Sequence, residues 1–347
     1  MFKIIEYKNL EGNYILIDVR SPGEFNEATI PGAINIPIFD DEDRKIIGTV
    51  FVNESVEKAK KLGVEAVSKK LPEIYSRILE LDKSYDKLVF FCAKGGMRSS
   101  SICSLMNSLG ISAFRIKGGY KGYRAFINDE LPKVNKDIKY IVIHGKTGVG
   151  KTELLNCLKN KGYNVLNLED SANHRGSLLG SVGLGKGRSQ KQFESLVYES
   201  LIKMEGTYVF VEGESKRIGD VIIPQYIYQA MINGIHFLAS ADLDFRAKVL
   251  IKEYAKQKNC KDEIIVSLNN MRKYIGEKSI DRYTELVLKG EYEEVSKELM
   301  LKYYDPMYTN ELNKYSYEIR FSIDNIEEST IYIESWLIEF LKHNVNE

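Results

Sequence analysis

The sequence predicts an α/β protein of two domains, each built on a parallel sheet. Short apolar strands alternate with helical stretches in both halves of the 347-residue chain, as in parallel sheets. In the second half, a glycine-rich phosphate-binding pattern directly follows a strand. Residues 132–138 are polar and begin with a proline, which indicates a linker. The predicted domains are therefore residues 1–131 and 139–347.

Composition argues against a strongly basic nucleic-acid-binding protein, a disulfide-rich protein and a membrane protein. The chain is 44% hydrophobic and 28% charged, as in ordinary globular proteins. Its 49 basic and 49 acidic residues cancel, so no overall basic field indicates nucleic acid, although local patches can still bind RNA. The four cysteines lie far apart without metal-ligand spacing, and we expect reduced thiols. No signal peptide or apolar run of ~18 residues occurs, so we expect a cytoplasmic protein without a membrane partner.

The first domain begins with a predicted strand over residues 14–19 and a second after the turn at residues 30–33. Residues 40–82 form a long insertion rich in lysine and glutamate. Apolar residues within 56–81 recur at helical spacing, which predicts one or two amphipathic helices with a solvated charged face.

Cys92 lies between a predicted buried strand, residues 88–91, and a helix that begins near Met97. A strand-to-helix turn of this kind points backbone N–H groups inward, and the helix N-terminus adds positive potential. Both features favour a thiolate, so we predict that Cys92 is a nucleophile and that Arg98 belongs to the same anion-binding loop. The alternative is that Cys92 is an inert buried cysteine.

A phosphate-binding loop is predicted after the strand at residues 139–144. Residues 145–152 match G-x-x-x-x-G-K-[ST] in full and lead into a helical segment, 153–158. Backbone amides of such a loop surround a diphosphate, while Lys151 supplies a point charge and Thr152 can reach Mg²⁺. The predicted phosphate-binding residues are Gly145, Lys146, Thr147, Gly148, Val149, Gly150, Lys151 and Thr152.

Two acids are candidates to organise a metal ion with Thr152. Glu212 ends the predicted strand 208–212, and Asp170 follows a similar strand predicted at 164–168. The alternative for each is a helix cap or a surface ion pair. The guanine-specificity motif Asn-Lys-x-Asp does not occur after the loop, which disfavours a GTPase.

Basic segments follow the phosphate-binding loop. Residues 171–193 contain five glycines and four basic residues without an acid, which indicates either a mobile lid over phosphates or a flexible surface loop. Residues 246–261 are also basic and fit a solvated helix equally well. Tyrosines cluster in residues 303–308 around an expected turn, and we expect them to pack in a core in preference to stacking on RNA bases. Arg175 is a candidate phosphate ligand, and the candidate RNA contacts are Arg188, Lys191, Arg217 and Arg246.

The first domain resembles rhodanese domains at residues 18–25 and 30–33, in the Cys92 loop, and at residues 117–120. In that family the loop cysteine carries sulfur or selenium. The Cys-x5-Arg spacing from Cys92 to Arg98 is also that of cysteine phosphatases and some arsenate reductases, which leaves this alternative open.

The whole chain resembles the tRNA 2-selenouridine synthase family. Besides the two loops, the resemblance rests on residues 41–44, 48–50, 168–177, 190–194, 212–219 and 304–308. Two positions depart from the family pattern, which usually has a bulky aromatic residue at Ala93 and an acid at Gly213.

This resemblance implies a two-step modification of wobble 2-thiouridine in tRNA. Geranyl diphosphate first alkylates the sulfur, and selenium from selenophosphate then replaces the geranylthio group. Lys151, Thr152 and Arg175 would hold the diphosphate, with Mg²⁺ as an expected cofactor, while Cys92 and Arg98 would handle selenium. A selenophosphate-supplying enzyme is a further expected partner. The alternatives are a phosphatase, arsenate reductase or sulfurtransferase fused to a kinase-like nucleotide-binding domain, and a non-catalytic module that senses nucleotide.

Overall fold

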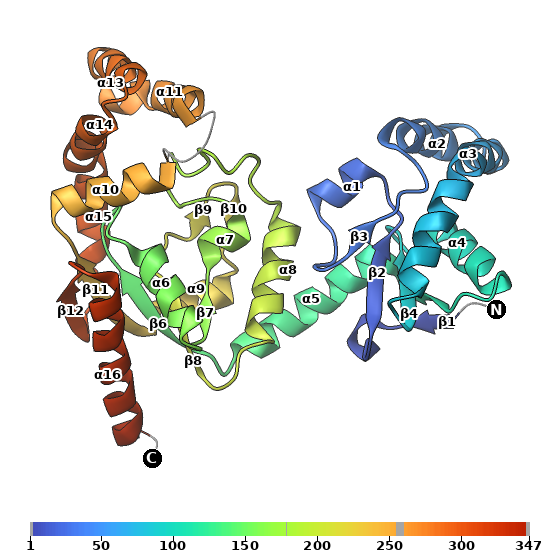
Figure 1. Cartoon of the computed structure of the whole chain (residues 1–347), viewed down its shortest axis with the longest axis horizontal. Coiled ribbons are helices and arrows are strands. Elements are labelled where there is room, and N and C mark those ends of the chain that lie inside the picture. Colours follow the sequence, from blue (N-terminus) through green and yellow to red (C-terminus); the bar gives the residue numbers. More distant parts are fainter. Residues whose placement is uncertain (1–2, 178, 255–259, 345–347) are drawn as a thin grey trace. The chain divides into compact units, whose positions relative to one another are not determined.

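The computed structural model describes residues 3–177, 179–254 and 260–344 (Figure 1). Lys256 and Lys258 of the predicted basic stretch lie outside these residues. The chain divides into two compact units, one comprising Met1–Leu131 and Glu194–Glu199, the other comprising Pro132–Phe193 and Ser200–Glu347. Among the described residues, no helix is long and apolar enough to cross a membrane.

The first unit is built on a five-stranded parallel sheet, in the order β1-β5-β4-β2-β3. Its strands are β1 Lys3–Ile5, β2 Tyr14–Asp18, β3 Ile34–Asn35, β4 Lys87–Phe91 and β5 Ala113–Ile116. Asp18 of β2 pairs with Phe91 of β4, so both strands end at the same edge. This register brings the turn after Asp18 beside Cys92.

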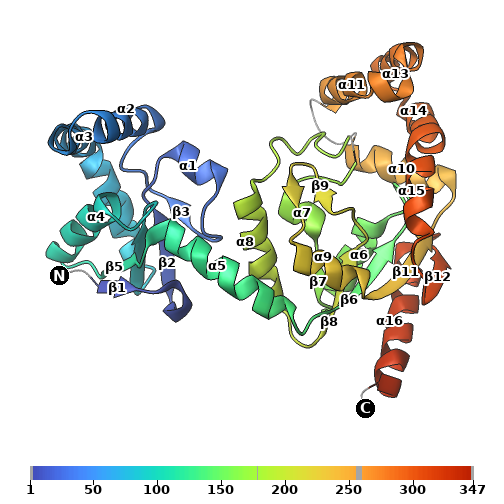
Figure 2. The same ribbon diagram turned by 180° about the vertical axis from the view of Figure 1, so that it is seen from behind.

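The helices of the first unit include two that fill the predicted insertion. They are α1 Pro22–Glu27, α2 Asp41–Asn53, α3 Val56–Asp82, α4 Met97–Ser108 and α5 Gly119–Asn135, with a short 3-10 helix at Tyr7–Asn9. Helices α2 and α3 lie side by side in both views (Figures 1 and 2). Ile74 and Ile78 of α3 are buried in the same cluster as Leu88 and Phe90 of β4, so the insertion is part of the domain core. Helix α5 continues through Pro132, so the first part of the expected linker is helical.

The second unit has a parallel sheet in the order β12-β11-β6-β8-β7. Its strands are β6 Lys139–His144, β7 Val165–Leu166, β8 Tyr208–Glu212, β11 Ile235–Ser240 and β12 Ile319–Ser322. A separate antiparallel pair joins β9 Arg217–Ile218 to β10 Val221–Ile222. Strand β6 is central, and both sheets confirm the predicted parallel α/β architecture. The strand expected at 164–168 is shorter, because Leu168 already begins a helix.

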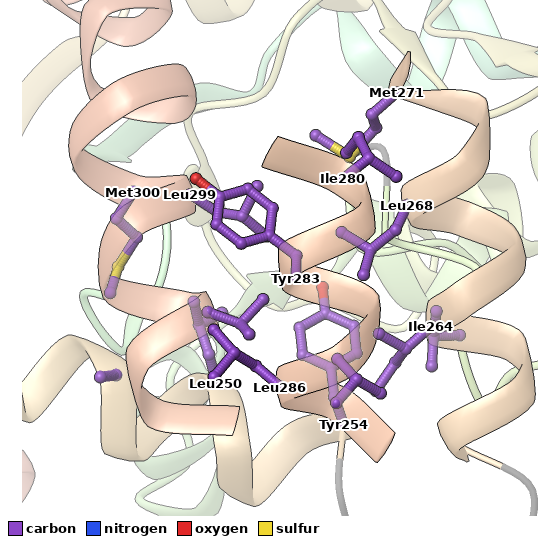
Figure 3. Packing of buried hydrophobic residues seen from close by; sticks show 14 of the residues in the cluster. Leu250, Tyr254, Ile264, Leu268, Met271, Ile280, Tyr283, Leu286, Leu299 and Met300 are labelled. Carbon is purple, nitrogen blue, oxygen red and sulfur yellow. The ribbon is translucent and has the colours of Figure 1, made fainter. Parts of the chain in front are cut away.

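Two groups of helices complete the second unit. Around the sheet lie α6 Lys151–Asn160, α7 Leu168–Ala172, α9 Gln225–Ile232, α10 Leu243–Tyr254 and α16 Ile326–Asn344. Helix α8 Gln190–Leu201 is divided, because its residues Glu194–Glu199 belong to the first unit. A helical cluster follows: α11 Cys260–Asn270, α12 Arg272–Ile275, α13 Glu277–Lys289, α14 Tyr292–Leu299, a π-helical turn Met300–Tyr304 and α15 Asp305–Leu312. Its buried core is shared with α10, so that Leu268 and Tyr283 of the cluster pack with Tyr254 of α10 (Figure 3).

The tyrosine-rich segment at residues 303–308 is helical, so the expectation of a turn is wrong. The π-helical turn runs directly into α15, and Pro306 lies in the first turn of α15, where a proline needs no backbone N–H. Tyr304 is buried in the core of the helical cluster, which confirms core packing for this tyrosine.

Candidate functional site

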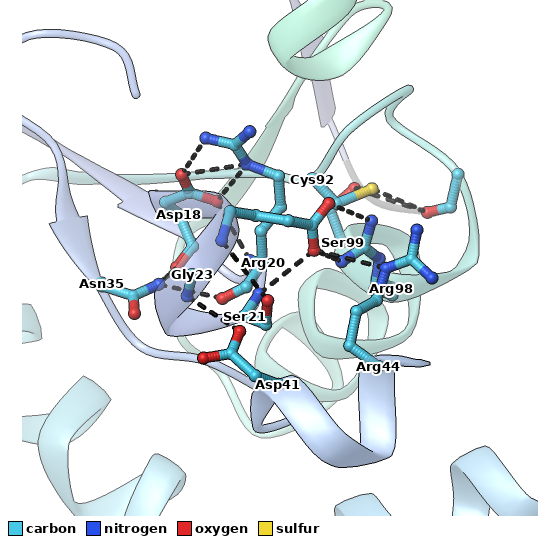
Figure 4. A network of polar contacts seen from close by, with 12 residues as sticks. Asp18, Arg20, Ser21, Gly23, Asn35, Asp41, Arg44, Cys92, Arg98 and Ser99 are labelled. Atoms are coloured by element: carbon cyan, nitrogen blue, oxygen red, sulfur yellow. Dashed lines mark hydrogen bonds and ion pairs between the residues drawn. The ribbon is translucent and has the colours of Figure 1, made fainter. Parts of the chain in front are cut away.

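Cys92 follows β4 and lies in the loop that leads to Gly96, the N-cap of α4. The residue is 3% exposed, so the sulfur is enclosed by its own loop. The Ser99 hydroxyl donates to Cys92 Sγ at 3.2 Å, and Figure 4 shows both residues beside Arg98 at the start of α4. A hydroxyl that donates to sulfur stabilises negative charge there. Burial raises the pKa of another cysteine of this unit, Cys103, to about 12, which keeps that thiol protonated.

The Cys92 loop is shaped by a close contact with the start of α5. Gly119 has φ +58°, and a Cβ there would lie 2.2 Å from the Cys92 carbonyl oxygen and 2.3 Å from Gly95 N. The Tyr120 N–H donates to the same Cys92 oxygen at 2.9 Å. Residues 117–120 therefore form the back wall of the loop, and only glycine fits at position 119.

Arg98 is bound by a carboxylate from α1. Its two terminal nitrogens contact the Glu24 carboxylate at 2.6 and 3.2 Å, and Arg44 Nε lies 3.4 Å from the same group. Burial alone would raise the pKa of Glu24, but the hydrogen bond and charge of Arg98 outweigh burial and lower this pKa. Arg98 thus shares the loop with Cys92 as predicted, but it carries a partner that the sequence analysis did not assign.

The phosphate-binding loop joins β6 to α6 at the carboxyl edge of the second sheet. Gly148 and Gly150 have φ +76° and +93°, and a Cβ on Gly148 would lie 2.7 Å from the Arg246 carbonyl oxygen. Lys151 opens α6, and its Nζ donates to the Gly145 carbonyl at 3.1 Å. The loop is therefore closely packed against the backbone of α10.

Several acids crowd the phosphate-binding loop. The Thr152 hydroxyl donates to Glu169 Oε2 at 3.3 Å, and the Glu169 N–H donates to Glu212 Oε1 at 2.8 Å. Glu214 and Glu253 line the same pocket as Lys151, together with Arg175, Ser177 and Tyr308. The pocket is small, with a volume of about 40 Å³, and its lining includes Arg175 and Ser177 of the glycine-rich segment.

Burial controls the protonation of these acids. It raises the pKa of Glu169 well above 4.5, and the neighbouring Glu214 and Glu212 carboxylates raise it further. Burial also raises the pKa of Glu214 and Glu253, and that of Glu212 to about 7. Bringing a cation to this cluster would offset the repulsion.

The predicted metal-organising residues are only partly brought together. Mg²⁺ is usually held by one or two carboxylates with water and substrate phosphates. Thr152 and Glu169 fit this requirement, and Glu212 Oε2 is buried without a hydrogen-bond partner among the described residues. Asp170 instead accepts a hydrogen bond from the Asn167 side chain at 2.8 Å. In the described part of the chain, no three His, Cys, Asp or Glu side chains form a ready-made metal site.

Arg246 lies behind the phosphate-binding loop, so an RNA contact is not supported for this residue. It is 4% exposed, and its terminal nitrogens bind both Asp305 oxygens at 3.0 and 2.6 Å. Arg246 Nε donates to the Thr147 carbonyl at 2.9 Å, and Lys146 Nζ contacts Asp305 at 3.1 Å. The expected solvated helix face is buried at this position because α15 covers it.

The remaining basic candidates lie in different settings. Arg175 lines the pocket of Lys151, where its Nη1 donates to the Val182 carbonyl at 2.7 Å. Arg188, Lys191 and Arg217 are all exposed. Gly176 packs against Glu214, whose Oε2 would lie 2.3 Å from a Cβ at that position. The glycine-rich segment therefore lies directly over the acids.

The departure from the family pattern at Gly213 has a steric reason. A Cβ there would lie 2.5 Å from His144 Nδ1, so the imidazole occupies the space that a side chain would need. Burial lowers the pKa of His144 to about 3, which keeps the ring neutral beside the phosphate-binding loop.

Fold and site together define a protein that joins a rhodanese-type cysteine loop to a P-loop domain. Two family models match the chain: "Rhodanese-like domain" over residues 6–126, and "tRNA 2-selenouridine synthase AAA domain" over residues 138–339. The chain belongs to the tRNA 2-selenouridine synthase family.

Similar proteins carry the same description along most of the chain. The tRNA 2-selenouridine synthase of Nitrosomonas europaea is 33% identical over 69% of this chain, a match that spans 63% of that relative. Those of Pseudomonas syringae pv. syringae and Hydrogenovibrio crunogenus are 28% and 29% identical, over 90% and 92% of this chain and 92% and 94% of their own length.

The contact at Gly119 generates a prediction about stability. Gly119→Ala should lower the free energy of unfolding by more than the roughly 1–2 kcal/mol expected for a left-handed alanine, because the added methyl group also meets fixed backbone atoms. Gly110→Ala is the matched control, since Gly110 has φ +87° but nothing within 4 Å of its Cβ position. Equal losses in denaturant titrations of the two variants would contradict this account.

Glu212 generates a prediction about pH. Its pKa of about 7 in the folded protein exceeds the ordinary 4.5, so the folded state binds this proton more tightly than the unfolded chain does. The contribution to stability is full below about pH 4.5 and is lost as pH rises through 7. Glu212→Gln should therefore flatten the fall of the melting temperature between about pH 5 and pH 7.5. Glu65→Gln, on the exposed surface of α3, should leave this fall unchanged. An unchanged slope for Glu212→Gln would refute the assignment.

Proposed function

We propose that this chain is a tRNA 2-selenouridine synthase that replaces the sulfur of wobble 2-thiouridine by selenium in two steps. Family membership supports this proposal. The observation that carries it is the presence in one chain of two different anion-binding turns. One holds a cysteine sulfur in contact with a hydroxyl donor, and the other is a complete phosphate-binding loop.

In the first step, the thiocarbonyl sulfur of 2-thiouridine attacks the first carbon of geranyl diphosphate. A C–S bond forms, and the C–O bond to the diphosphate breaks. The diphosphate leaves with the electron pair, so its negative charge must be stabilised. Lys151 and Arg175 line the pocket that would receive it, and Mg²⁺ held by Thr152 and Glu169 would neutralise further charge.

In the second step, selenium replaces the geranylthio group at C2 of the base. The selenium of selenophosphate attacks C2, so that a C–Se bond forms and the C–S bond breaks, with geranylthiolate as the leaving group. Water then cleaves the P–Se bond, which releases phosphate and leaves selenium on the base. The Cys92 loop would bind the selenophosphate anion for this attack, and the Ser99 hydroxyl, which contacts Cys92 Sγ, would help to stabilise negative charge there.

Cys92→Ser tests the second step. We expect geranylated tRNA to accumulate while selenouridine falls to background, because the hydroxyl cannot replace the thiolate. The purified variant is incubated with thiolated tRNA, geranyl diphosphate and selenophosphate, and nucleosides are identified by mass spectrometry. Cys103→Ser is the control, since the Cys103 thiol is buried and protonated. Normal selenouridine from Cys92→Ser would exclude this role.

Lys151→Ala tests the first step. Loss of its charge beside the departing diphosphate should slow geranylation by about 100–1000-fold, so that 2-thiouridine remains. The same variant should still convert tRNA that is supplied already geranylated. Failure of that second reaction, with an unchanged melting temperature, would show that the two loops do not divide the steps in this way.

A further inference from the structure

A large apolar groove lies beside the Cys92 loop, within the first unit. Its volume is about 1010 Å³, at the upper end of the ~300–1,000 Å³ typical of small-molecule sites. Helices α2 and α3 form two walls, and the start of α4 forms the third. The apolar lining includes Ile47, Phe51 and Val52 of α2, Ala59, Val64, Val67 and Leu71 of α3, and Met97 of α4.

Several of these apolar side chains are exposed to solvent. Val52 is 79% exposed, Val64 70%, Met97 52% and Phe51 44%, although all four line one groove. Contiguous exposed apolar surface of this kind marks a binding site. Gly63 of α3 packs against the Phe39 ring, since a Cβ there would lie 3.3 Å from it. The groove is thus suited to an apolar chain.

The charged residues of the groove are all basic. Arg44, Lys60, Lys94, Arg98 and Arg115 line it, and no acid is found among the described residues of its lining. Arg44 and Arg98 are bound by Glu24, which lies outside the lining, so the positive charge where the groove meets the Cys92 loop comes from Lys94. This charge pattern fits a ligand with an apolar chain and an anionic end.

We propose that this groove binds the ten-carbon chain of the geranylthio group while selenium replaces that group. The inference rests on the proposed function and adds the place of the prenyl chain. The phosphates that flank the modified nucleotide supply the anionic end and meet the basic side of the groove. Met97 and Arg98 line the groove and also begin α4, so a chain seated there lies next to the loop that presents selenium.

Two anticodon stem-loop RNAs test this proposal with the full chain. They differ only at the wobble position, which carries S-geranyl- or S-methyl-2-thiouridine. The chain should bind the geranylated RNA about tenfold or more tightly than the methylated one, because apolar area leaves water. Val64→Glu should remove this preference, since a carboxylate in the groove opposes an apolar chain, and it should lower the affinity for the methylated RNA no more than the same charge placed elsewhere on α3 does.

Matched variants make the result specific. Leu79→Glu places the same charge on α3 at an exposed leucine outside the groove lining, and it should keep the preference. Phe51→Glu alters the facing wall on α2 and should reproduce the loss; it decides the question if Val64→Glu melts early. Equal wild-type affinity for the two RNAs, or an intact preference in both groove variants, would overturn the proposal. Dimerisation abolished by Val64→Glu, with the RNA preference retained, would assign the groove to a second copy of the chain.

A second readout separates this inference from the proposed function. Wild-type protein is given the geranylated stem-loop and selenophosphate, and selenouridine is measured. Conversion that Val64→Glu and Phe51→Glu leave unchanged would refute the groove and leave the proposed function standing. Absence of conversion by the wild type would refute the proposed function. In that case, a roughly tenfold binding preference for the geranylated RNA that Val64→Glu abolishes would still support the groove.

Discussion

Both anion-binding turns depend on the close approach of a second backbone segment. In the first unit, Gly119 brings the start of α5 against the Cys92 carbonyl, and in the second, Gly148 brings the loop against the Arg246 carbonyl. Side chains at these two glycines would collide with backbone atoms that cannot rotate away. Each turn is therefore held in shape from behind by main chain, and within the second turn the Val149 N–H already donates to the Lys146 carbonyl at 3.2 Å.

The two sites handle charge in opposite ways. In the first unit the cations already have partners: Arg98 binds Glu24, and buried Arg20 binds Asp18 at 2.6 Å. In the second unit, buried acids face Lys151 across a narrow pocket and repel one another. An anion that reaches the cysteine loop must compete with Glu24 for Arg98. A cation brought to the second site would offset the repulsion among its acids.

Sequence patterns predicted the features that depend on short segments. The strand, glycine turn and helix around residues 145–152 and the Cys92 loop are local patterns, and both are found. Contacts across the fold could not be predicted in this way: Glu24 on Arg98, Ser99 on Cys92, and Glu169 beside Thr152 come from tertiary packing. The carboxylate beside Thr152 is Glu169, one residue before the predicted Asp170, because a helix replaces the end of the expected strand. Arg246 was misjudged because periodicity does not show which helix face another helix covers.

The Asp305 carboxylate connects the C-terminal helices to the phosphate-binding backbone. It binds Arg246 and Lys146 together, and Arg246 in turn holds the Thr147 carbonyl. Lys146 and Thr147 both belong to the loop that would surround the diphosphate. A displacement of α15 is therefore transmitted through two side chains to the main chain of this loop. The position of α15 and the conformation of the phosphate-binding loop are therefore coupled through these side chains.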